Sequence, residues 1–284
     1  MLLRVSIVSY FSDAHELTTT VQSLCESAAQ FNGQVKLILT DNTDHATDSI
    51  RLATLVGHWI QSGFLRALAG FEFRQTGKNL GYGQANNAAL MSVSSAAKKR
   101  SDPTPSTYLL VLNPDIKLHT DALAQADQYM RENPDCVLLA PRALSLTGDD
   151  LLLNHSKPTI LALLGRFIKA PAWLTPVRLA MDNYEMRDLP PDQPHEQTIC
   201  ASGCFMLARA HAFTSIGGFD ARFFMYFEDY DLTVRLRRLG RVCYQPLVRV
   251  THFGGDASSK GITHSRMFVT SAFRFFQRHG WNLG

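Results

Sequence analysis

Four groups of polar residues follow predicted strands and could together form a site for a phosphorylated ligand. They are Ser9-Tyr10, Asp41-Asn42-Thr43-Asp44, the segment 79–87, and Asn113-Pro114-Asp115. In an open α/β sheet, ligands bind at the carboxyl ends of the strands, so we expect the four groups at one edge. A hard cation bound by Asp115 at that edge could hold a diphosphate, because such ions prefer oxygen ligands.

Taken singly, these residues also have ordinary structural explanations. Asp41 could form a turn or cap a helix, and it could equally accept the imide N–H of a pyrimidine base. The segment that holds Asn79, Gly81 and Asn86 could hydrogen-bond a ribose or phosphate, or simply form a turn before a helix. Its glycine spacing differs from the dinucleotide fingerprint. Only the four groups together favour a nucleotide-diphosphate site.

The second half of the chain places three acids, Glu228, Asp229 and Asp231, within four residues after an aromatic run. These acids could favour a helix N-terminus through its dipole, or one could deprotonate an acceptor hydroxyl. The basic residues from Arg235 onward are expected on a solvated face. His252 ends a predicted strand, and it could be a structural group or complete the coordination of a cation at the Asn113-Pro114-Asp115 turn.

The elements that must position these residues alternate between strands and helices in the first half. Alternation predicts right-handed βαβ units and an α/β fold with a mostly parallel sheet. Ser12 or Asp13 is expected to cap the first helix. The expected strands are 4–10, 35–40, 71–74, 108–112 and 136–140, and the expected helices are 15–30, 50–69, 83–99 and 120–132.

The second half is less regular. Residues 145–197 carry many prolines and no clean period, so they fit no regular pattern, and we expect them to shape an acceptor cleft. The elements expected after them are a strand or strand pair at 198–208, a helix at 227–239, short strands at 241–244 and 247–252, and a closing helix at 265–279.

Composition excludes several classes of protein. The 284 residues are 45% hydrophobic, which is enough for one large core or two small ones. A net charge of +3 is too small to indicate nucleic acid as a main partner. No apolar run reaches the length of a spanning helix, and the first residues fit a strand better than a signal sequence. Five cysteines without zinc spacing indicate reduced thiols and a cytoplasmic protein.

These residues together resemble the inverting nucleotide-sugar glycosyltransferases of family 2, and within them the bacterial rhamnosyltransferase branch. The resemblance runs from about Arg4 to Gly255 and is most specific over 202–236. It implies a single GT-A domain, Rossmann-like in its nucleotide-sugar half. The implied divisions are a nucleotide-sugar-binding half at 1–141, an acceptor-binding and catalytic half at 142–255, and a helical tail at 256–284.

The resemblance also implies roles for single residues. Asp229 matches the catalytic base, and Asp41 the residue that binds the pyrimidine base. Asp115 is the retained acid of the family's Asp-X-Asp motif, whose first acid is replaced by Asn113, and it would bind Mg²⁺ or Mn²⁺ with His252. The remaining implied contacts are to the donor from Ser9, Tyr10, Asn79, Gly81, Asn86, Asn113, Asp115, Ser202 and Gly203, and to the acceptor from Glu228 and Phe227.

The implied reaction transfers L-rhamnose from dTDP-L-rhamnose to a polysaccharide or lipid-linked glycan. One alternative is another nucleotide sugar, such as a UDP-hexose. A second is a degenerate, non-catalytic glycan-binding protein, for which Asn113 is the only support. A two-metal nuclease fits poorly because the acids are not clustered. The segments 157–181 and 266–281 mix apolar and basic residues, so they are expected to contact the inner face of the cytoplasmic membrane, or to form core or homodimer contacts.

Overall fold

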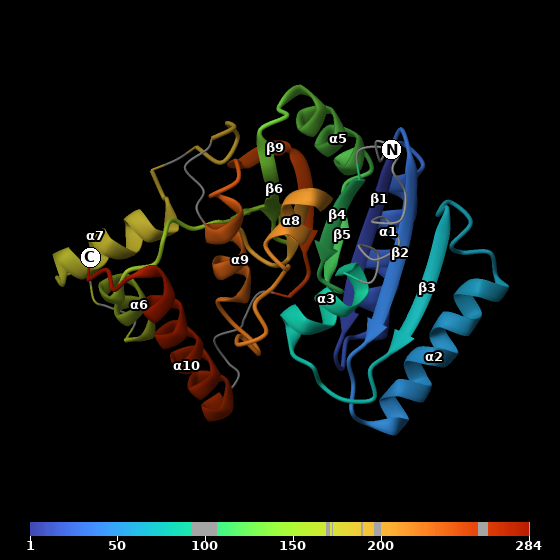
Figure 1. The fold of residues 1–284 in the computed structure, drawn as a ribbon, viewed down its shortest axis with the longest axis horizontal. Helices are drawn as coiled ribbons and strands as arrows, with labels where there is room; N and C mark the ends of the chain where they lie inside the picture. The colour runs from blue at the N-terminus through green and yellow to red at the C-terminus, as the bar shows by residue number, and fades with distance from the viewer. Residues whose placement is uncertain are drawn as a thin grey trace.

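The computed structural model of the protein describes residues 1–91, 107–168, 171, 173–188, 190–195, 200–254 and 261–283. The strands are β1 (Leu2–Ser9), β2 (Gln34–Asp41), β3 (Gly70–Gln75), β4 (Thr107–Leu112), β5 (Ile116–Leu118), β6 (Cys136–Leu144), β7 (Asp150–Leu151), β8 (Phe205–Arg209) and β9 (Arg241–His252). They form one nine-stranded sheet in the order β3-β2-β1-β4-β8-β6-β9-β5, and β7 pairs with β6 (Figure 1).

Most of the sheet runs in one direction. β1 pairs in parallel with β2 and β4, β2 pairs in parallel with β3, and β6 pairs in parallel with β9. β8 lies between β4 and β6 and is antiparallel to both, so β6 and β9 share the direction of β1. Their carboxyl ends therefore lie toward the same edge. This arrangement confirms the α/β fold with a mostly parallel sheet.

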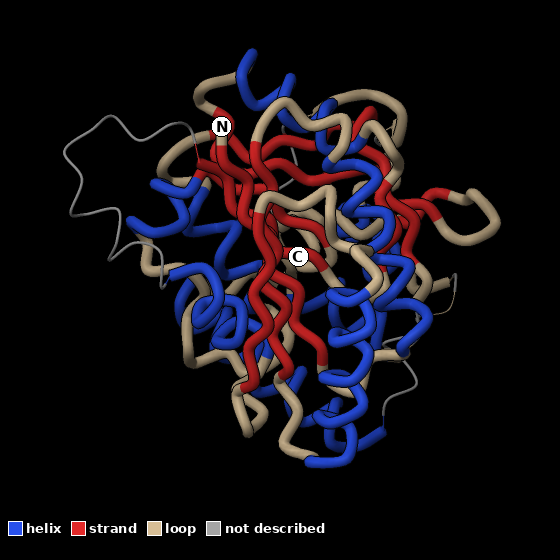
Figure 2. Tube along the Cα trace, turned by 90° about the vertical axis from the view of Figure 1, so that its right-hand side faces the viewer, coloured by secondary structure: helices blue, strands red, loops and turns tan. Residues whose placement is uncertain are grey.

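Helices cover both faces of the curled sheet (Figure 2). The helices are α1 (Ala14–Ala28), α2 (Ala46–Gln61), α3 (Tyr82–Met91), α5 (Ala122–Glu132), α6 (Ile160–Phe167), α7 (Thr175–Glu185), α8 (Ala210–Ser215), α9 (Glu228–Leu236) and α10 (Gly261–His279). No helix within the described residues combines the length and the apolar character needed to cross a bilayer. α6, α7 and α10 group at one end of the molecule, away from β3 and α2 (Figure 1).

Alternation along the strands divides the core between the two faces. In β4, Leu110 and Leu112 pack with residues of α1, α2 and α5, whereas Leu109 and Val111 pack with α3, α8 and α9. A third cluster joins α9 to α10 and α6 through aromatic rings, with Phe227 and Phe275 at its centre. The site edge is therefore held by packing on both faces and by the helical end of the molecule.

Several expected elements are confirmed with shifted ends, and others were wrong or missed. Residues 145–197 fit no regular pattern in the sequence, and the structure shows that they contain β7, α6 and α7. The strands expected at 241–244 and 247–252 are one strand, β9, whose pairing with β6 shifts register after Pro141. β5 and α8 had no sequence prediction because each is only a few residues long. Parts of two predictions, helix residues 92–99 and strand residues 198–199, lie outside the described residues.

Local signals explain why the first helix begins where it does. Asp13 is extended and its side chain accepts hydrogen bonds from the backbone N–H groups of His15 (2.9 Å) and Glu16 (3.0 Å). Such a cap satisfies donors that have no partner inside the helix. The predicted cap at Asp13 is thus confirmed. All five cysteines are buried free thiols, as their spacing indicated.

Candidate active site

The carboxyl ends of four strands bring the predicted site residues to one edge. Ser9 pairs with Asp41 at the ends of β1 and β2, and the backbone N–H of Asn113 donates to the carbonyl of Cys204 at 2.9 Å. His252 ends β9 and pairs with Ile116, the residue after Asp115. Three of the four polar groups and the histidine therefore meet where the topology predicts a ligand site.

Hydroxyl groups of α1 hold the Asn113-Pro114-Asp115 turn in place. The Thr20 hydroxyl donates to the Pro114 carbonyl at 2.8 Å and accepts from the Ile116 backbone N–H at 3.1 Å. Ser23 accepts from the N–H of Leu118 in the same way, at 3.0 Å. The buried hydroxyls satisfy backbone groups that β5, an edge strand of three residues, leaves open. They fix the backbone from which Asp115 projects.

Asp115 and His252 face each other without a direct hydrogen bond. His252 Nε2 lies 3.9 Å from Asp115 Oδ2. Burial lowers the pKa of His252, and the carboxylate of Asp115 acts in the opposite direction. A neutral imidazole with a free lone pair beside a carboxylate is a common pair of cation ligands.

Two observations fit a divalent cation at this pair, and a third limits what the protein alone can supply. Asp115 Oδ1 and His252 Nδ1 are buried and have no hydrogen-bond partner among the described residues. A Cβ at Gly254 would lie 2.8 Å from Asp115 Oδ2, so glycine keeps space open beside the carboxylate. No cluster of three or more His, Cys, Asp or Glu able to hold a metal occurs among the described residues. The protein alone therefore offers two ligands, and the others must come from water or a bound diphosphate.

Asparagines connect the second strand to the glycine-containing segment at 79–87. The Asn42 amide donates to Asn79 Oδ1 at 3.1 Å and accepts from the backbone N–H of Leu80 at 3.0 Å. Asn79 Oδ1 also accepts from the N–H of Gly81 at 2.9 Å. Gly81 has a φ of +77°, and an added Cβ would collide with the carbonyl oxygen of Phe224. Glycine is therefore required at this position, where two parts of the chain nearly touch.

Tyr82 joins both halves of the chain at the site. Its hydroxyl lies 2.9 Å from Asn113 Oδ1 and 2.6 Å from the carbonyl oxygen of Gly203, and its backbone N–H donates to the Phe224 carbonyl at 3.1 Å. Burial raises the pKa of Tyr82 well above its ordinary value, so the phenol stays neutral. Sequence reasoning did not single out Tyr82. Its position between two glycines on a predicted turn was the only signal.

Asp229 is held by two backbone donors at the start of α9. Its Oδ2 accepts from the N–H of Gly203 and its Oδ1 from the N–H of Tyr230, both at 2.9 Å. Burial raises the pKa of Asp229 to about 6, although the hydrogen bonds from Gly203 and Tyr230 act to lower it. A carboxylate with such a pKa is mostly ionised at neutral pH and is a stronger base than an ordinary aspartate. Burial therefore outweighs the helix N-terminus, which by itself would weaken the base.

A strained turn aims this carboxylate. Tyr226 and Phe227 both adopt left-handed conformations, with φ of 68° and 63°. Such conformations cost about 1–3 kcal/mol each for residues with side chains, and they persist only where packing enforces them. Here Phe227 packs against Phe268 and Phe275 of α10, with ring centroids 5.1 and 5.5 Å apart. α10 thus maintains the turn that places Asp229.

Several predicted contacts occupy positions inside the protein. Asn86 is fully buried, accepts from the Ser6 hydroxyl at 2.7 Å and donates to the Tyr82 carbonyl at 3.0 Å. Phe227 is buried in the aromatic cluster, and Glu228 is buried with its Oε2 lacking a partner among the described residues. Burial, and then the neighbouring Asp229, raise the pKa of Glu228 well above its usual range. In this structure Asn86 and Phe227 support the site rather than line it.

Asp41 is also buried, and both its carboxylate oxygens have partners. Oδ1 accepts from the Thr43 N–H at 3.0 Å, and Oδ2 accepts from the Ser49 hydroxyl. Each carboxylate oxygen can accept a second hydrogen bond, so these contacts orient the group without saturating it. Tyr10, by contrast, is 41% exposed beside Phe11. The hydroxyl of Ser202, another predicted donor contact, accepts a hydrogen bond from the backbone N–H of Cys204 at 3.3 Å.

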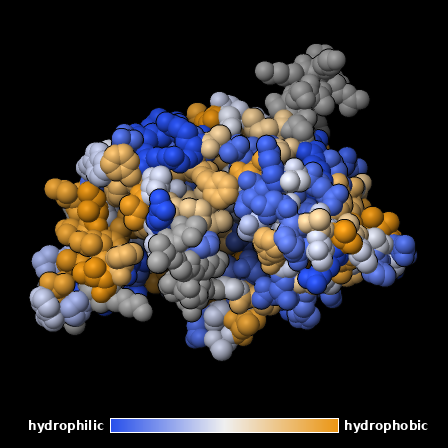
Figure 3. Space-filling view, turned by 90° about the horizontal axis from the view of Figure 1, so that it is seen from below, coloured by the Kyte–Doolittle hydropathy of each residue, from blue (hydrophilic) through white to orange (hydrophobic). Residues whose placement is uncertain are grey.

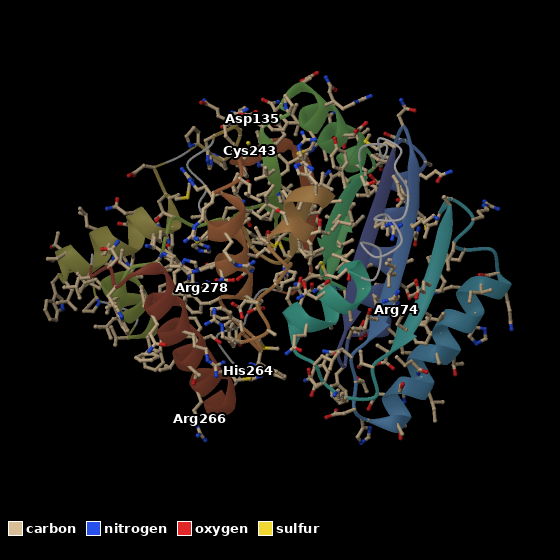
Figure 4. All side chains as sticks on the ribbon, in the orientation of Figure 1. Arg74, Asp135, Cys243, His264, Arg266 and Arg278 are labelled. Atoms are coloured by element: carbon tan, nitrogen blue, oxygen red, sulfur yellow. The ribbon has the colours of Figure 1, made fainter. Side chains whose placement is uncertain are left out.

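Asp231 forms a buried ionic cluster that links α10 to α9. It lies 2.7 Å from Arg235 Nε and 2.8 Å from His279 Nε2, and Arg278 approaches it at 3.2 Å. Arg278 also pairs with Asp220 in the loop before α9. Figure 4 labels Arg278 on α10. Arg235 was expected on a solvated face. That was wrong, because pairing with Asp231 allows the guanidinium to be buried.

Comparison with known proteins identifies the family. A profile described as Glycosyltransferase like family 2 matches residues 106–269, which is more than half of the chain. The chain therefore belongs to this family of glycosyltransferases. The match includes the Asn113-Pro114-Asp115 turn, Asp229 and His252, whereas Ser9, Asp41 and Asn79 lie before the matched residues.

Two sequence relatives extend the comparison. The chain is 29% identical over 218 residues to the N-acetylglucosaminyl-diphospho-decaprenol L-rhamnosyltransferase of Mycobacterium tuberculosis H37Rv, covering 72% of this chain and 67% of the relative. It is 27% identical over 263 residues to Rhamnosyltransferase WbbL of Escherichia coli K12, covering 91% and 88%. The similarity therefore extends well beyond the residues that the family profile matches.

Solved structures agree on the fold. TarS 1–349 of S. aureus superposes with a TM-score of 0.54 at 12% identity, covering 98% of this chain and 73% of that one. The mannosyltransferase PcManGT from Pyrobaculum calidifontis, solved with GDP-Man and Mn²⁺, gives 0.56 at 11% identity, covering 98% and 75%. At these identities the likeness shows the GT-A fold alone.

Proposed function

We propose that the protein transfers L-rhamnose from dTDP-L-rhamnose to the glycan of a lipid-linked acceptor, with inversion and with a divalent cation. The observation that carries the catalytic part is Asp229, whose raised pKa and two backbone hydrogen bonds suit a general base at the site edge. The choice of rhamnose is supported by the names of both sequence relatives, and the choice of a lipid-linked acceptor by the name of the Mycobacterium tuberculosis relative.

In the proposed reaction an acceptor hydroxyl attacks the anomeric carbon of the donor sugar. The new bond forms from that oxygen, the bond from the anomeric carbon to the diphosphate breaks, and the hydroxyl proton passes to Asp229. The transition state has oxocarbenium character, as in glycoside hydrolysis. A positioned base contributes about 10²–10⁴-fold, so positioning of both substrates must supply much of the remaining acceleration.

Asp115 and His252 are the proposed ligands of the cation. When bound, a divalent cation neutralises the charge that develops on the departing diphosphate. Asn113 replaces an acid at this turn, which leaves Asp115 as the one anionic ligand there. We therefore expect the cation to bind together with the donor diphosphate rather than before it.

The proposed donor site lies in the nucleotide-sugar half, residues 1–141. Asp41 is proposed to accept the imide N–H of the thymine ring with a remaining lone pair, beside Ser9 and the exposed Tyr10. The segment from Asn79 to Gly81 is proposed to follow the ribose or diphosphate. Residues 142–255 are proposed to hold the acceptor.

A donor panel tests the substrate. Purified protein with Mg²⁺ or Mn²⁺ is incubated with dTDP-L-rhamnose, UDP-glucose, UDP-galactose or GDP-mannose and a synthetic N-acetylglucosaminyl-diphospho-undecane acceptor, and the glycosylated product is measured by mass spectrometry. We expect rhamnosyl product only. Preferential use of a UDP-hexose would overturn the rhamnose assignment. Absence of transfer from every donor would favour the non-catalytic alternative.

A peripheral membrane position is proposed for the helical end of the molecule. Its exposed apolar side chains include Phe167 (69% exposed), Trp173 (77%) and Trp281 (56%), and Arg166 and Arg178 lie near them in sequence. Apolar surface gathers at this end of the molecule (Figure 3). Flotation with anionic vesicles tests the position: wild type should float, and Phe167→Ser/Trp173→Ser should not. The alternative, a homodimer through this surface, predicts a concentration-dependent mass in solution.

A further inference from the structure

A cavity of about 270 Å³ lies between α10 and the loop that precedes α9. Its walls are Phe224 and Met225 from the loop, and Arg266, Thr270 and Arg274 from α10 among others. The three α10 residues are four apart, so they share one face of the helix. The cavity therefore combines two cations with an apolar floor, and none of its lining residues is acidic.

The two arginines have spare hydrogen-bonding capacity. Arg266 forms no ion pair or hydrogen bond among the described residues and is exposed near the N-terminal end of α10 (Figure 4). Among the described residues Arg274 donates one bond, from Nη1 to the Arg222 carbonyl, and its other N–H groups have no partner there. Asp220, in the loop before α9, pairs with Arg222 and Arg278. A guanidinium presents several donors in one plane and suits the oxygens of a phosphate.

The cavity adjoins the loop that leads into the strained turn at Tyr226 and Phe227. The Phe224 carbonyl accepts from the Tyr82 N–H at 3.1 Å, and the Met225 carbonyl accepts from the Ser271 hydroxyl at 2.8 Å. The same loop continues through the strained turn to Asp229. A ligand in the cavity would therefore lie beside the loop that places the base, outside the strand-end edge assigned to the donor diphosphate.

Apolar side chains stand next to the cavity on α10. Val269 is 60% exposed and Phe273 is 51% exposed, one helical turn apart. Trp281 packs edge-on against Phe273, with centroids 5.4 Å apart, and is itself 56% exposed. A ligand with an anionic head and a hydrocarbon tail would suit this surface, because the head could lie against the arginines and the tail against the apolar side chains.

We propose that this cavity binds the phosphate groups of the acceptor, an isoprenoid-type diphosphate whose hydrocarbon chain lies along Val269 and Phe273. This inference rests on the proposed function, because it assigns a location to the anionic lipid end of that acceptor. It gives α10 a second role besides maintaining the turn at Tyr226 and Phe227: the helix orients the acceptor so that its sugar extends toward Asp229.

Binding of a sugar-free probe tests the proposal without any turnover. Undecyl diphosphate is titrated calorimetrically below its micelle concentration, with dTDP and Mg²⁺ saturating the donor site. Arg266→Gln and Arg274→Gln should each weaken binding about tenfold, the loss expected for a charge-assisted contact. Arg66→Gln, which removes an equal charge after α2, should leave binding unchanged. Undecyl maltoside has a similar chain and an uncharged head, and it should bind at least tenfold more weakly.

Each outcome decides between named alternatives. If the Arg266→Gln and Arg66→Gln proteins bind undecyl diphosphate with equal affinity, the proposal is overturned. Arg266→Glu is a second test, and like Arg266→Gln it leaves the contact between Arg274 and the Arg222 carbonyl in place. Another outcome is that the arginine variants lose binding to phosphatidylglycerol vesicles while their affinity for undecyl diphosphate is unchanged. That result would assign the arginines to membrane headgroups, and it would also overturn the proposal. If Arg266→Gln loses the probe while the wild type transfers no sugar, the proposed reaction fails and the phosphate site stands.

Discussion

The pH dependence of transfer provides the sharpest test of Asp229 as the base. Its pKa of about 6 lies roughly two units above the ordinary aspartate value of 3.8, so its affinity for a proton is about 100-fold higher. The catalytic form is the ionised one, so activity should be full at high pH and fall as pH drops through about 6. At pH 7 about nine-tenths of the protein should have the ionised base, and at pH 5 about one-tenth.

The physical cause is burial, so the effect depends on the protein remaining folded. An aspartate with an ordinary pKa would stay ionised down to about pH 4, and the rate would then hardly change between pH 5 and 8. Asp229→Asn should lower kcat by about 10²–10⁴-fold and remove this pH step, because the amide cannot take a proton. Donor affinity should change little, since the residue stands on the acceptor side.

The assay measures dTDP release and rhamnosyl product from pH 5 to 8, with circular dichroism at each pH to verify folding. Asp188→Asn is the matched control, because Asp188 is exposed and lies outside the site. A wild-type rate that is level from pH 5 to 8 would contradict the raised pKa. An Asp229→Asn variant that keeps the wild-type step would show that another group carries it.

Three further substitutions test parts of the site. His252→Ala should raise the Mn²⁺ concentration for half-maximal donor binding at least about tenfold, measured by fluorescence titration; an unchanged titration would contradict the ligand assignment. Gly81→Ala should lower the free energy of unfolding by about 3 kcal/mol and Gly77→Ala by about 1, because both have positive φ but only Gly81 would collide with Phe224; equal costs in urea denaturation would refute this. Asp231→Asn should lower the free energy of unfolding by about 3–5 kcal/mol, because Arg235 loses its buried anionic partner. A loss below about 1 kcal/mol, as expected for a surface residue, would refute the role of this ionic cluster.

The sequence predicted the first half of the fold well for a physical reason. Strands such as 108–112 are short apolar runs between prolines, and the helices between strands have a polar face and clear ends. Asp13 could be recognised as a cap because capping depends on residues within one turn. These signals are local, so they can be recognised in the linear sequence.

The second half was less predictable because its order comes from distant contacts. α6 and α7 pack on each other and, through Ile160 and Leu163, on the aromatic cluster of α9 and α10. Their sequence alone shows prolines and no clean period. β5 has three residues and exists because α1 hydroxyls and β9 satisfy its backbone. Neither feature has a local signature.

By itself, then, the sequence determined the α/β class, the family resemblance, and the residue types at the strand ends, because these depend on composition and short-range pattern. Only the tertiary structure decided which of those residues face the site. It placed Asn86 and Phe227 inside, made Tyr82 the link between the halves, and raised the pKa of Asp229 to about 6. Burial and electrostatic environment come from residues far apart in the chain, so they are fixed only when the chain has folded.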